Sequence, residues 1–89
     1  MPVFVIVVYD VSPKRDALVL KVCRQYLTWV QNSVFEGDVT ETQMRIFWQR
    51  LGDTINKQED SVVAYTFDSM RYSARQSMGV KKGGEEWVV

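Results

Sequence analysis

Histidine is absent from this 89-residue chain, and cysteine occurs once, as Cys23. Without histidine the chain has no imidazole general base and no Ser–His or Cys–His nucleophilic pair. A single cysteine excludes an internal disulfide and a zinc cluster of several thiolates. A small domain without disulfides fits a reducing cytosol, so we expect a cytoplasmic protein. Carboxylate chemistry with a hard ion such as Mg²⁺ is the catalytic route that remains.

An excess of charge is also lacking, because 11 Lys and Arg residues balance 11 Asp and Glu residues. Free-standing nucleic-acid binders usually carry excess Lys and Arg. A role on nucleic acid would therefore depend on local charge or on a more basic partner. A glycine-rich phosphate loop is missing too, since Gly83-Gly84 follows no strand-to-helix pattern.

Long hydrophobic runs do not occur, and the apolar opening at residues 3–8 is too short to span a membrane. This opening has neither the basic start nor the cleavage site of a signal peptide, and we expect no membrane contact. Apolar residues are nevertheless plentiful, at 46% of the chain with 3 Trp, 4 Tyr and 4 Phe. One small core needs less apolar material, which favours a second buried surface against a partner subunit.

Residues 3–9 form an uninterrupted apolar run, which predicts a strand that is covered on both faces. A helix is predicted over residues 13–27, with Ser12 as N-cap and Pro13 in the first turn. Its buried stripe is formed by Val19, Val22, Cys23 and Tyr26. A basic arc on another side of the helix is either solvated or faces phosphate, and consists of Lys14, Lys21, Arg24 and Gln25.

Residues 28–38 favour extended structure, either as one kinked strand or as a tight pair, with a turn at Gly37-Asp38. The next helix is predicted from a capping box between Thr40 and Gln43, followed by apolar residues at helical spacing. Strands are predicted over residues 61–67 and, more weakly, over residues 71–78.

These elements predict an α+β sandwich in which two helices cover one face of a sheet. The domain is expected to span residues 1–78, and residues 79–89 to form a linker and a C-terminal strand. Self-association through the other face would bury the first strand, with Trp87, Val88 and Val89 joining the partner's sheet.

Asp10 is the candidate catalytic and metal-binding residue, because it ends a buried strand at an exposed edge. The alternative is a turn residue that helps to cap the first helix. One carboxylate is a poor magnesium site, but a two-fold axis at this edge would bring a second Asp10 opposite. Candidate nucleic-acid contacts, with ordinary surface charge or core packing as their alternatives, are Tyr9, Lys14, Arg15, Arg71 and Arg75.

Two segments about twenty residues apart resemble one known family, the CRISPR-associated protein 2 family. They are Val7-Val8-Tyr9-Asp10-Val11 and Val30-Gln31-Asn32-Ser33-Val34-Phe35-Glu36-Gly37. The resemblance extends over essentially the whole chain. One departure is Trp29, where many relatives carry Arg, so any substrate contact made by that Arg is missing from this sequence.

The resemblance implies a ferredoxin-like fold and a symmetric homodimer whose C-terminal strand adds to the partner's sheet. It implies a role in spacer acquisition for antiviral defence, bridging two copies of CRISPR-associated protein 1, the integrase, around DNA. It also implies a metal-dependent endonuclease of RNA or DNA in which one Asp10 from each subunit shares a magnesium ion. Other motif positions are Tyr9, Arg15, Gln31, Ser33 and Phe35.

Two hypotheses stay open at this point: a metal-dependent endonuclease, and a non-catalytic dimeric scaffold that joins the integrase and DNA. A regulatory domain that binds a small ligand between subunits is a weaker third, because no ligand-specific motif supports it.

Overall fold

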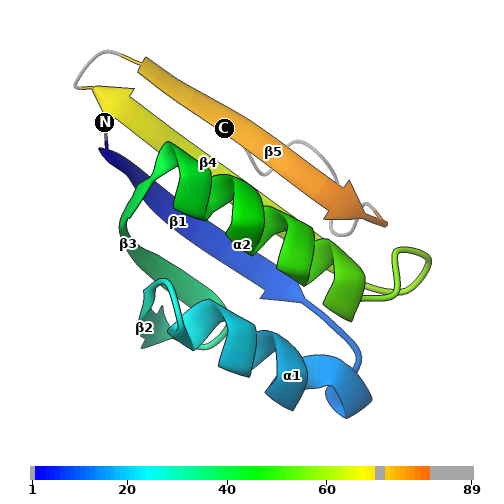
Figure 1. The fold of residues 1–89 in the computed structure, drawn as a ribbon. Helices are drawn as coiled ribbons and strands as arrows, with labels where there is room; N and C mark the ends of the chain where they lie inside the picture. The colour runs from blue at the N-terminus through cyan, green and yellow to red at the C-terminus, as the bar shows by residue number, and fades with distance from the viewer. Residues whose placement is uncertain (1, 70–71, 81–89) are drawn as a thin grey trace.

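The computed structural model describes residues 2–69 and 72–80 of the chain. Figure 1 shows the elements in chain order: β1 (Pro2–Asp10), α1 (Pro13–Arg24), β2 (Thr28–Gln31), β3 (Val34–Thr40), α2 (Glu41–Thr54), β4 (Ser61–Ser69) and β5 (Tyr72–Gly79). Arg71, Trp87, Val88 and Val89, which carried predictions, lie outside the described residues.

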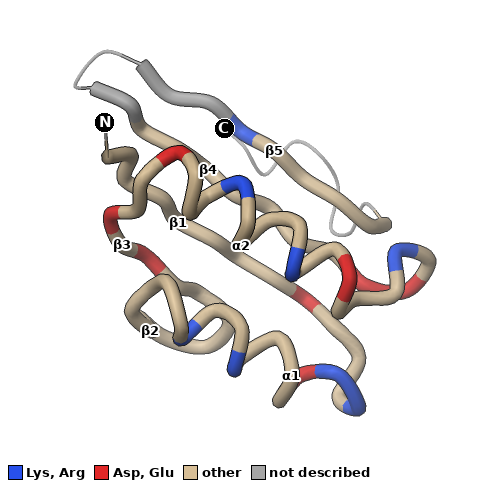
Figure 2. Tube along the Cα trace, in the orientation of Figure 1, with Lys and Arg blue, Asp and Glu red and all other residues tan. Residues whose placement is uncertain are grey.

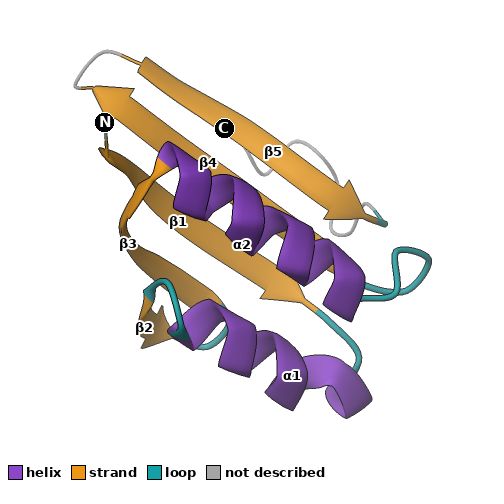
Figure 3. Cartoon of the chain, in the orientation of Figure 1, coloured by secondary structure: helices purple, strands orange, loops and turns teal. Residues whose placement is uncertain are grey.

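The five strands form one sheet in the order β2-β3-β1-β4-β5, and every neighbouring pair is antiparallel. Both helices lie on the same face of this sheet (Figures 1 and 3). The predicted α+β sandwich with two helices on one face is therefore confirmed. No helix in the described part of the chain has the length and apolarity needed to cross a membrane.

The core lies between the helices and the central strand β1, which buries every second residue from Val3 to Tyr9. Val19, Val22 and Cys23 cover it from α1, as their spacing predicted. The helix ends at Arg24 and not at residue 27, so its predicted length was wrong. The backbone N–H of Gln25 donates to Val22 O at 3.2 Å, which tightens the last turn and ends the regular helix.

Residues 28–40 fold as a tight strand pair, which decides between the two predicted forms. Asn32 has a φ of 46° in the turn, a conformation that asparagine tolerates better than most residues. The predicted turn at Gly37-Asp38 was wrong, because β3 runs through both residues and Gly37 pairs with Val5. A Cβ on Gly37 would lie 3.3 Å from Leu27 Cδ2, so this glycine lets Leu27 pack closely over the strand.

The predicted capping box begins α2. The Gln43 N–H donates to Thr40 Oγ1 at 3.0 Å, and the Thr40 N–H donates to Gln43 Oε1 at 2.8 Å. Met44, Phe47 and Leu51 then face the core at helical spacing. Both the helical spacing of the apolar residues and the capping box lie within one short segment, which explains why the sequence alone predicted this helix.

The face of the sheet opposite the helices is apolar over β1 and β4, whereas β3 and β5 add charged side chains to it. We call it the open face, and its residues on β1 and β4 are Phe4, Ile6, Val8, Val63, Tyr65 and Phe67. Val8 is 38% exposed and Phe67 is 37% exposed, whereas Val62 and Ala64 on the other side of β4 are fully buried. Among the described residues, β1 is covered on one face only, by the helices, so its predicted burial on both faces stays a prediction.

Candidate functional site

Asp10 is the last residue of the central strand, and its side chain is exposed. In the β1–β4 ladder its partner is Ser61, the first residue of β4. Only Val11 and Ser12 separate it from Pro13, where α1 begins. Asp10 therefore lies at a corner where the end of β1, the start of α1 and the start of β4 meet.

Asp60 is a second carboxylate at this corner, and it is fully buried. Its Oδ1 accepts a hydrogen bond from the Ser12 N–H at 2.9 Å, and its Oδ2 accepts one from the Asn56 N–H at 2.9 Å. Arg15 donates to it twice, from Nε at 2.6 Å and from Nη2 at 3.1 Å. Asp60 thus connects the α2–β4 loop to the beginning of α1.

The surroundings of Asp60 keep it ionised. The hydrogen bond from Arg15 holds the pKa of this carboxyl well below its usual range, outweighing the burial that would raise it. The backbone N–H groups of Asn56 and Ser12 lower the pKa further. The hydrogen bonds that Arg15 donates to Asp60 and to Glu59 raise the pKa of Arg15 above its ordinary value. The pair therefore stays charged throughout the neutral range.

Ser12 occupies the N-cap position of α1, as predicted, but its side chain makes no capping hydrogen bond. Its backbone N–H is taken by Asp60, 48 residues away in the sequence. A buried anion beside a helix N-terminus also interacts favourably with the helix dipole. Sequence reasoning missed Asp60. The only indication of Asp60 in the sequence was its place as an acidic residue directly before a predicted strand, and this place does not indicate which groups it binds.

The guanidinium of Arg15, which was predicted to contact phosphate, is paired with Asp60 and with Glu59. Its Nη2 lies 2.7 Å from Glu59 Oε1. Its side chain is 15% exposed. A phosphate contact by Arg15 stays a prediction, and it would have to compete with two carboxylates. Lys14 lies beside it, exposed in the first turn of α1.

Tyr9 packs in the core, which was the alternative to base stacking. It is 4% exposed and its ring stacks on Phe35 with centroids 6.2 Å apart. Burial raises the pKa of the Tyr9 hydroxyl to about 12. Stacking of this ring on a base would require the core to open.

The two sequence segments that carried the resemblance meet at the end of β1. The Tyr9 N–H donates to Ser33 O at 3.1 Å, and Phe35 lies under the Tyr9 ring. Ser33 is half-buried and Gln31 is exposed at the β2–β3 turn. These motif positions therefore hold the strand end that presents Asp10.

Arg75 is exposed near the middle of β5, opposite Tyr65. Asp10 aligns with the far end of β5, through Ser61 and Gly79. The structure therefore does not bring Arg75 to the corner that holds Asp10. Figure 2 shows further basic positions along both helices.

A metal ion at this corner would meet the exposed carboxylate of Asp10. Within residues 2–69 and 72–80 there is no group of three His, Cys, Asp or Glu side chains that could hold a metal. Mg²⁺ is commonly held by one or two carboxylates and keeps several waters. The exposed carboxylate of Asp10 fits such a site as one ligand, and a second copy of the chain would supply the other.

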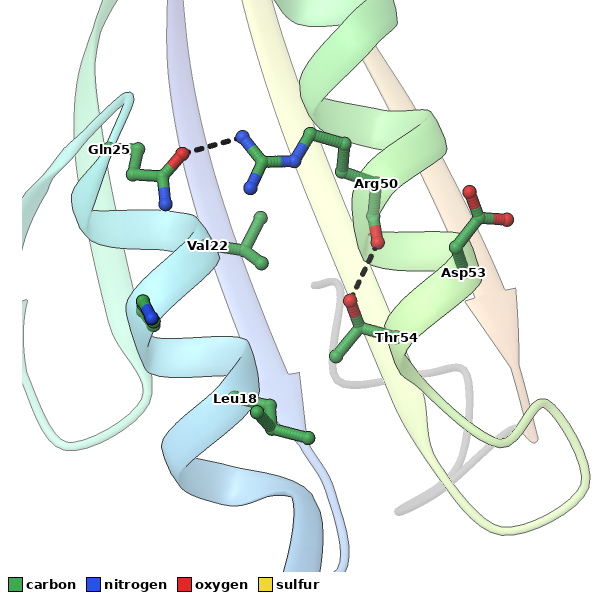
Figure 4. Close-up of a pocket in the computed structure, with 7 residues that line it drawn as sticks. Leu18, Val22, Gln25, Arg50, Asp53 and Thr54 are labelled. Atoms are coloured by element: carbon green, nitrogen blue, oxygen red, sulfur yellow. Dashed lines mark hydrogen bonds between the residues drawn. The ribbon is translucent and has the colours of Figure 1, made fainter.

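A separate cleft of about 390 Å³ opens between the two helices (Figure 4). Arg50 crosses it, donating hydrogen bonds to Gln25 and to Tyr26 Oη. Its lining residues are Leu18, Lys21, Val22, Gln25, Arg50, Asp53 and Thr54. None of the predicted site residues lines it, so the corner at Asp10 remains the candidate site.

Comparison with known proteins gives consistent matches. Residues 1–75 match the family described as CRISPR associated protein Cas2. The CRISPR-associated endoribonuclease Cas2 of Dictyoglomus turgidum is 41% identical over 86 residues, covering 97% of this chain and 99% of the relative. The protein of the same name from Thermococcus kodakarensis is 46% identical over 86 residues, with the same coverage. A solved structure titled crystal structure of cas2 matches with a TM-score of 0.74 and 36% identity, covering 97% of each chain.

Proposed function

The chain belongs to the CRISPR associated protein Cas2 family, and from this membership we propose that it is a metal-dependent endoribonuclease acting in CRISPR adaptation. The observation that carries the proposal is the placement of Asp10. This carboxylate is exposed at the end of the central strand, and the family's sequence segments around Tyr9 and Ser33 pack together beneath it. Its substrate would be RNA or DNA.

The proposed active form is a homodimer joined across the open face. That face exposes Val8 and Phe67 beside half-buried aromatic and aliphatic residues, a pattern typical of a surface that binds another protein. A two-fold axis near the corner would place one Asp10 from each subunit at a shared site. Residues 79–89, including Trp87, Val88 and Val89, would add a strand to the partner's sheet beyond the domain formed by residues 1–78.

The proposed cofactor is one Mg²⁺ held by the two Asp10 carboxylates. Such an ion supplies activated water and stabilises negative charge on a phosphodiester. The protein's own part is to hold each carboxylate at the exposed end of β1. Histidine is absent from the sequence, so no imidazole takes part in proton transfer.

A second candidate function is a non-catalytic scaffold that bridges CRISPR-associated protein 1 and DNA. Two observations favour it: Tyr9 is buried, and Arg15 is paired with Asp60 and Glu59. The net charge of zero points the same way, because the chain carries no excess of positive charge to attract phosphate. In this hypothesis a more basic partner supplies most of the contacts with DNA. The single buried Cys23 fits a cytoplasmic setting for either role.

The substitution Asp10→Asn tests the catalytic proposal. It removes the charge and keeps the size of the side chain, so Mg²⁺-dependent cleavage of RNA and DNA should be lost. Asp53→Asn, at an exposed position on α2, is the matched control and should cut like the wild type. Undiminished cleavage by Asp10→Asn would overturn the catalytic role. Loss of cleavage with intact spacer acquisition would assign the cellular role to the scaffold.

The dimer is tested by placing a charge on the open face. Ile6→Lys should dissociate the dimer, because an unpaired ammonium cannot be buried against an apolar partner. Ile46→Lys is the control, since Ile46 is 46% exposed on α2, on the other side of the sheet. Sedimentation velocity should show a monomer only for the first variant. A monomeric wild type, or a dimer that tolerates Ile6→Lys, would contradict the proposed interface.

A further inference from the structure

Asp60 touches both sides of the strand end that carries Asp10. On one side it immediately precedes Ser61, the residue that pairs with Asp10 in the β1–β4 ladder. On the other side its carboxylate holds the N–H of Ser12, two residues beyond Asp10. One buried residue therefore adjoins the ladder partner of Asp10 and binds the backbone two residues after it.

We propose that Asp60 is the positioning residue for Asp10, fixing the turn after β1 through Ser12 and Arg15. The inference rests on the proposed function, because it takes Asp10 as the metal-binding carboxylate. Asp60 itself touches neither metal nor substrate in this account.

The turn between β1 and α1 depends on Asp60 for its hydrogen bonding. Ser12 makes no side-chain cap, and Asp60 accepts from the Ser12 N–H, the group that a side chain at the third helical position binds in a capping box. The Arg15 N–H donates to Ser12 O at 2.9 Å while its guanidinium holds Asp60, and these contacts close a ring around the first turn of α1. Loss of the carboxylate would leave the Ser12 N–H and the Arg15 guanidinium without this partner.

The same residue fixes the point where β5 ends. The Val80 N–H donates to Asp60 O at 2.9 Å. Gly79 has a φ of 95°, and a Cβ at this position would lie 1.9 Å from the carbonyl oxygen of Asp60. A side chain at residue 79 would therefore push the backbone of Asp60 out of place. The position of Asp10 is thus linked through Asp60 to the place where the chain continues into residues 81–89.

Small displacements of Asp10 matter because a metal shared between two subunits needs both carboxylates at once. A misplacement of about 1 Å can lower the rate of an enzyme about 100-fold. A positioning residue should therefore alter metal binding without unfolding the sheet, which separates its effect from a purely structural one.

The test compares Asp60→Asn with the control Glu59→Gln in the full chain. Glu59 contacts the same arginine, but its side chain is 54% exposed and it does not touch Ser12. NMR would follow a Mn²⁺ titration through broadening of the Asp10 and Val11 amide signals, together with hydrogen exchange of the Ser12 amide. In Asp60→Asn we expect the Mn²⁺ concentration for half-maximal broadening to rise about tenfold and Ser12 exchange to accelerate about tenfold. Glu59→Gln should change either by less than about twofold.

Amides of Val5 and Val7 in the core report whether the variant is folded, and their exchange should be unchanged. If Asp60→Asn does not fold, Arg15→Gln replaces it: this change removes the guanidinium but keeps the acceptor for Ser12, and we expect about a threefold loss of Mn²⁺ affinity. A folded variant with wild-type Mn²⁺ affinity would overturn the positioning role.

Cleavage assays separate this outcome from failure of the proposed function. If Asp10→Asn abolishes cleavage while Asp60→Asn keeps wild-type Mg²⁺ dependence, Asp10 is catalytic and Asp60 does not position it. If Mn²⁺ does not broaden the Asp10 signal in the wild type, the metal site and the positioning role both fail.

Discussion

Asp10 and Asp60 lie at the same corner of the sheet, yet one is exposed and the other is fully buried. Asp60 is fully buried and accepts hydrogen bonds from Ser12, Asn56 and Arg15. Asp10 is exposed at the end of β1, next to the residues that link it to α1. The same chemical group is thus a structural anion in Asp60 and a candidate metal ligand in Asp10.

The comparison shows why residue type alone does not define a metal site. A buried carboxylate whose oxygens are already bonded to an arginine and two backbone N–H groups offers little to a cation. An exposed carboxylate on a rigid strand end can bind one with little rearrangement of the protein. Four substitutions at this corner would sharpen or break the contrast.

The largest effect is expected from Asp60→Ala. It leaves the Arg15 guanidinium and two backbone N–H groups without the partner that the fold provides, at a cost of about 3 kcal/mol in the free energy of unfolding. Asp10→Ala should cost less than about 1 kcal/mol, since exposed positions tolerate substitution. Urea unfolding measures both. Equal losses for the two variants would contradict the distinction between a structural and a functional carboxylate.

A smaller effect is expected at acid pH. The Arg15 hydrogen bond lowers the pKa of Asp60 in the folded state, so this group stabilises the fold above its unfolded pKa of about 4, and the contribution is lost as pH falls further. Asp60→Asn removes that contribution, so its stability should fall less steeply than that of the wild type below about pH 4. Urea unfolding between about pH 2 and pH 7 gives both slopes. Parallel curves would mean that Asp60 is not the titrating group.

The smallest effect is expected from Glu59→Gln. Glu59 forms an ion pair with the same arginine at 2.7 Å, but its side chain is exposed to solvent. An exposed ion pair contributes less than about 1 kcal/mol to the free energy of unfolding and is screened by salt. The unfolding free energy of Glu59→Gln should approach that of the wild type as salt is raised. A loss as large as that of Asp60→Ala would show that Arg15, and not the buried carboxylate, is the central residue of the corner.

Local patterns predicted much of the fold. The capping box at Thr40 and Gln43 acts within four residues, and α2 begins where it indicates. A strand was predicted over residues 61–67, and β4 contains it; Val62 and Ala64 are buried there, whereas Val63 and Tyr65 are half-buried, as the alternation of a strand requires. The apolar run at residues 3–9 predicted a strand, and β1 spans Pro2–Asp10; the burial of both its faces stays a prediction.

The rest depends on contacts between distant segments. Ser12 and Asp60 are 48 residues apart, and nothing near Asp60 in the sequence indicates which N–H group it binds. Gly37 resembled a turn residue, because its close contact with Leu27 exists only after the sheet and the end of α1 have met. Asp10 was predicted from its place at a strand end, and the structure confirms its position and exposure; its chemistry stays a prediction.

The most direct test of a site shared by two Asp10 residues is a subunit-mixing experiment. Wild-type and Asp10→Asn chains would be unfolded together, refolded at a series of ratios, and assayed for Mg²⁺-dependent cleavage per total protein. If one ion needs both carboxylates, an equal mixture should retain about one quarter of wild-type activity, because only dimers with two wild-type chains are active. Retention of about one half would show that each chain acts alone and would contradict the shared site.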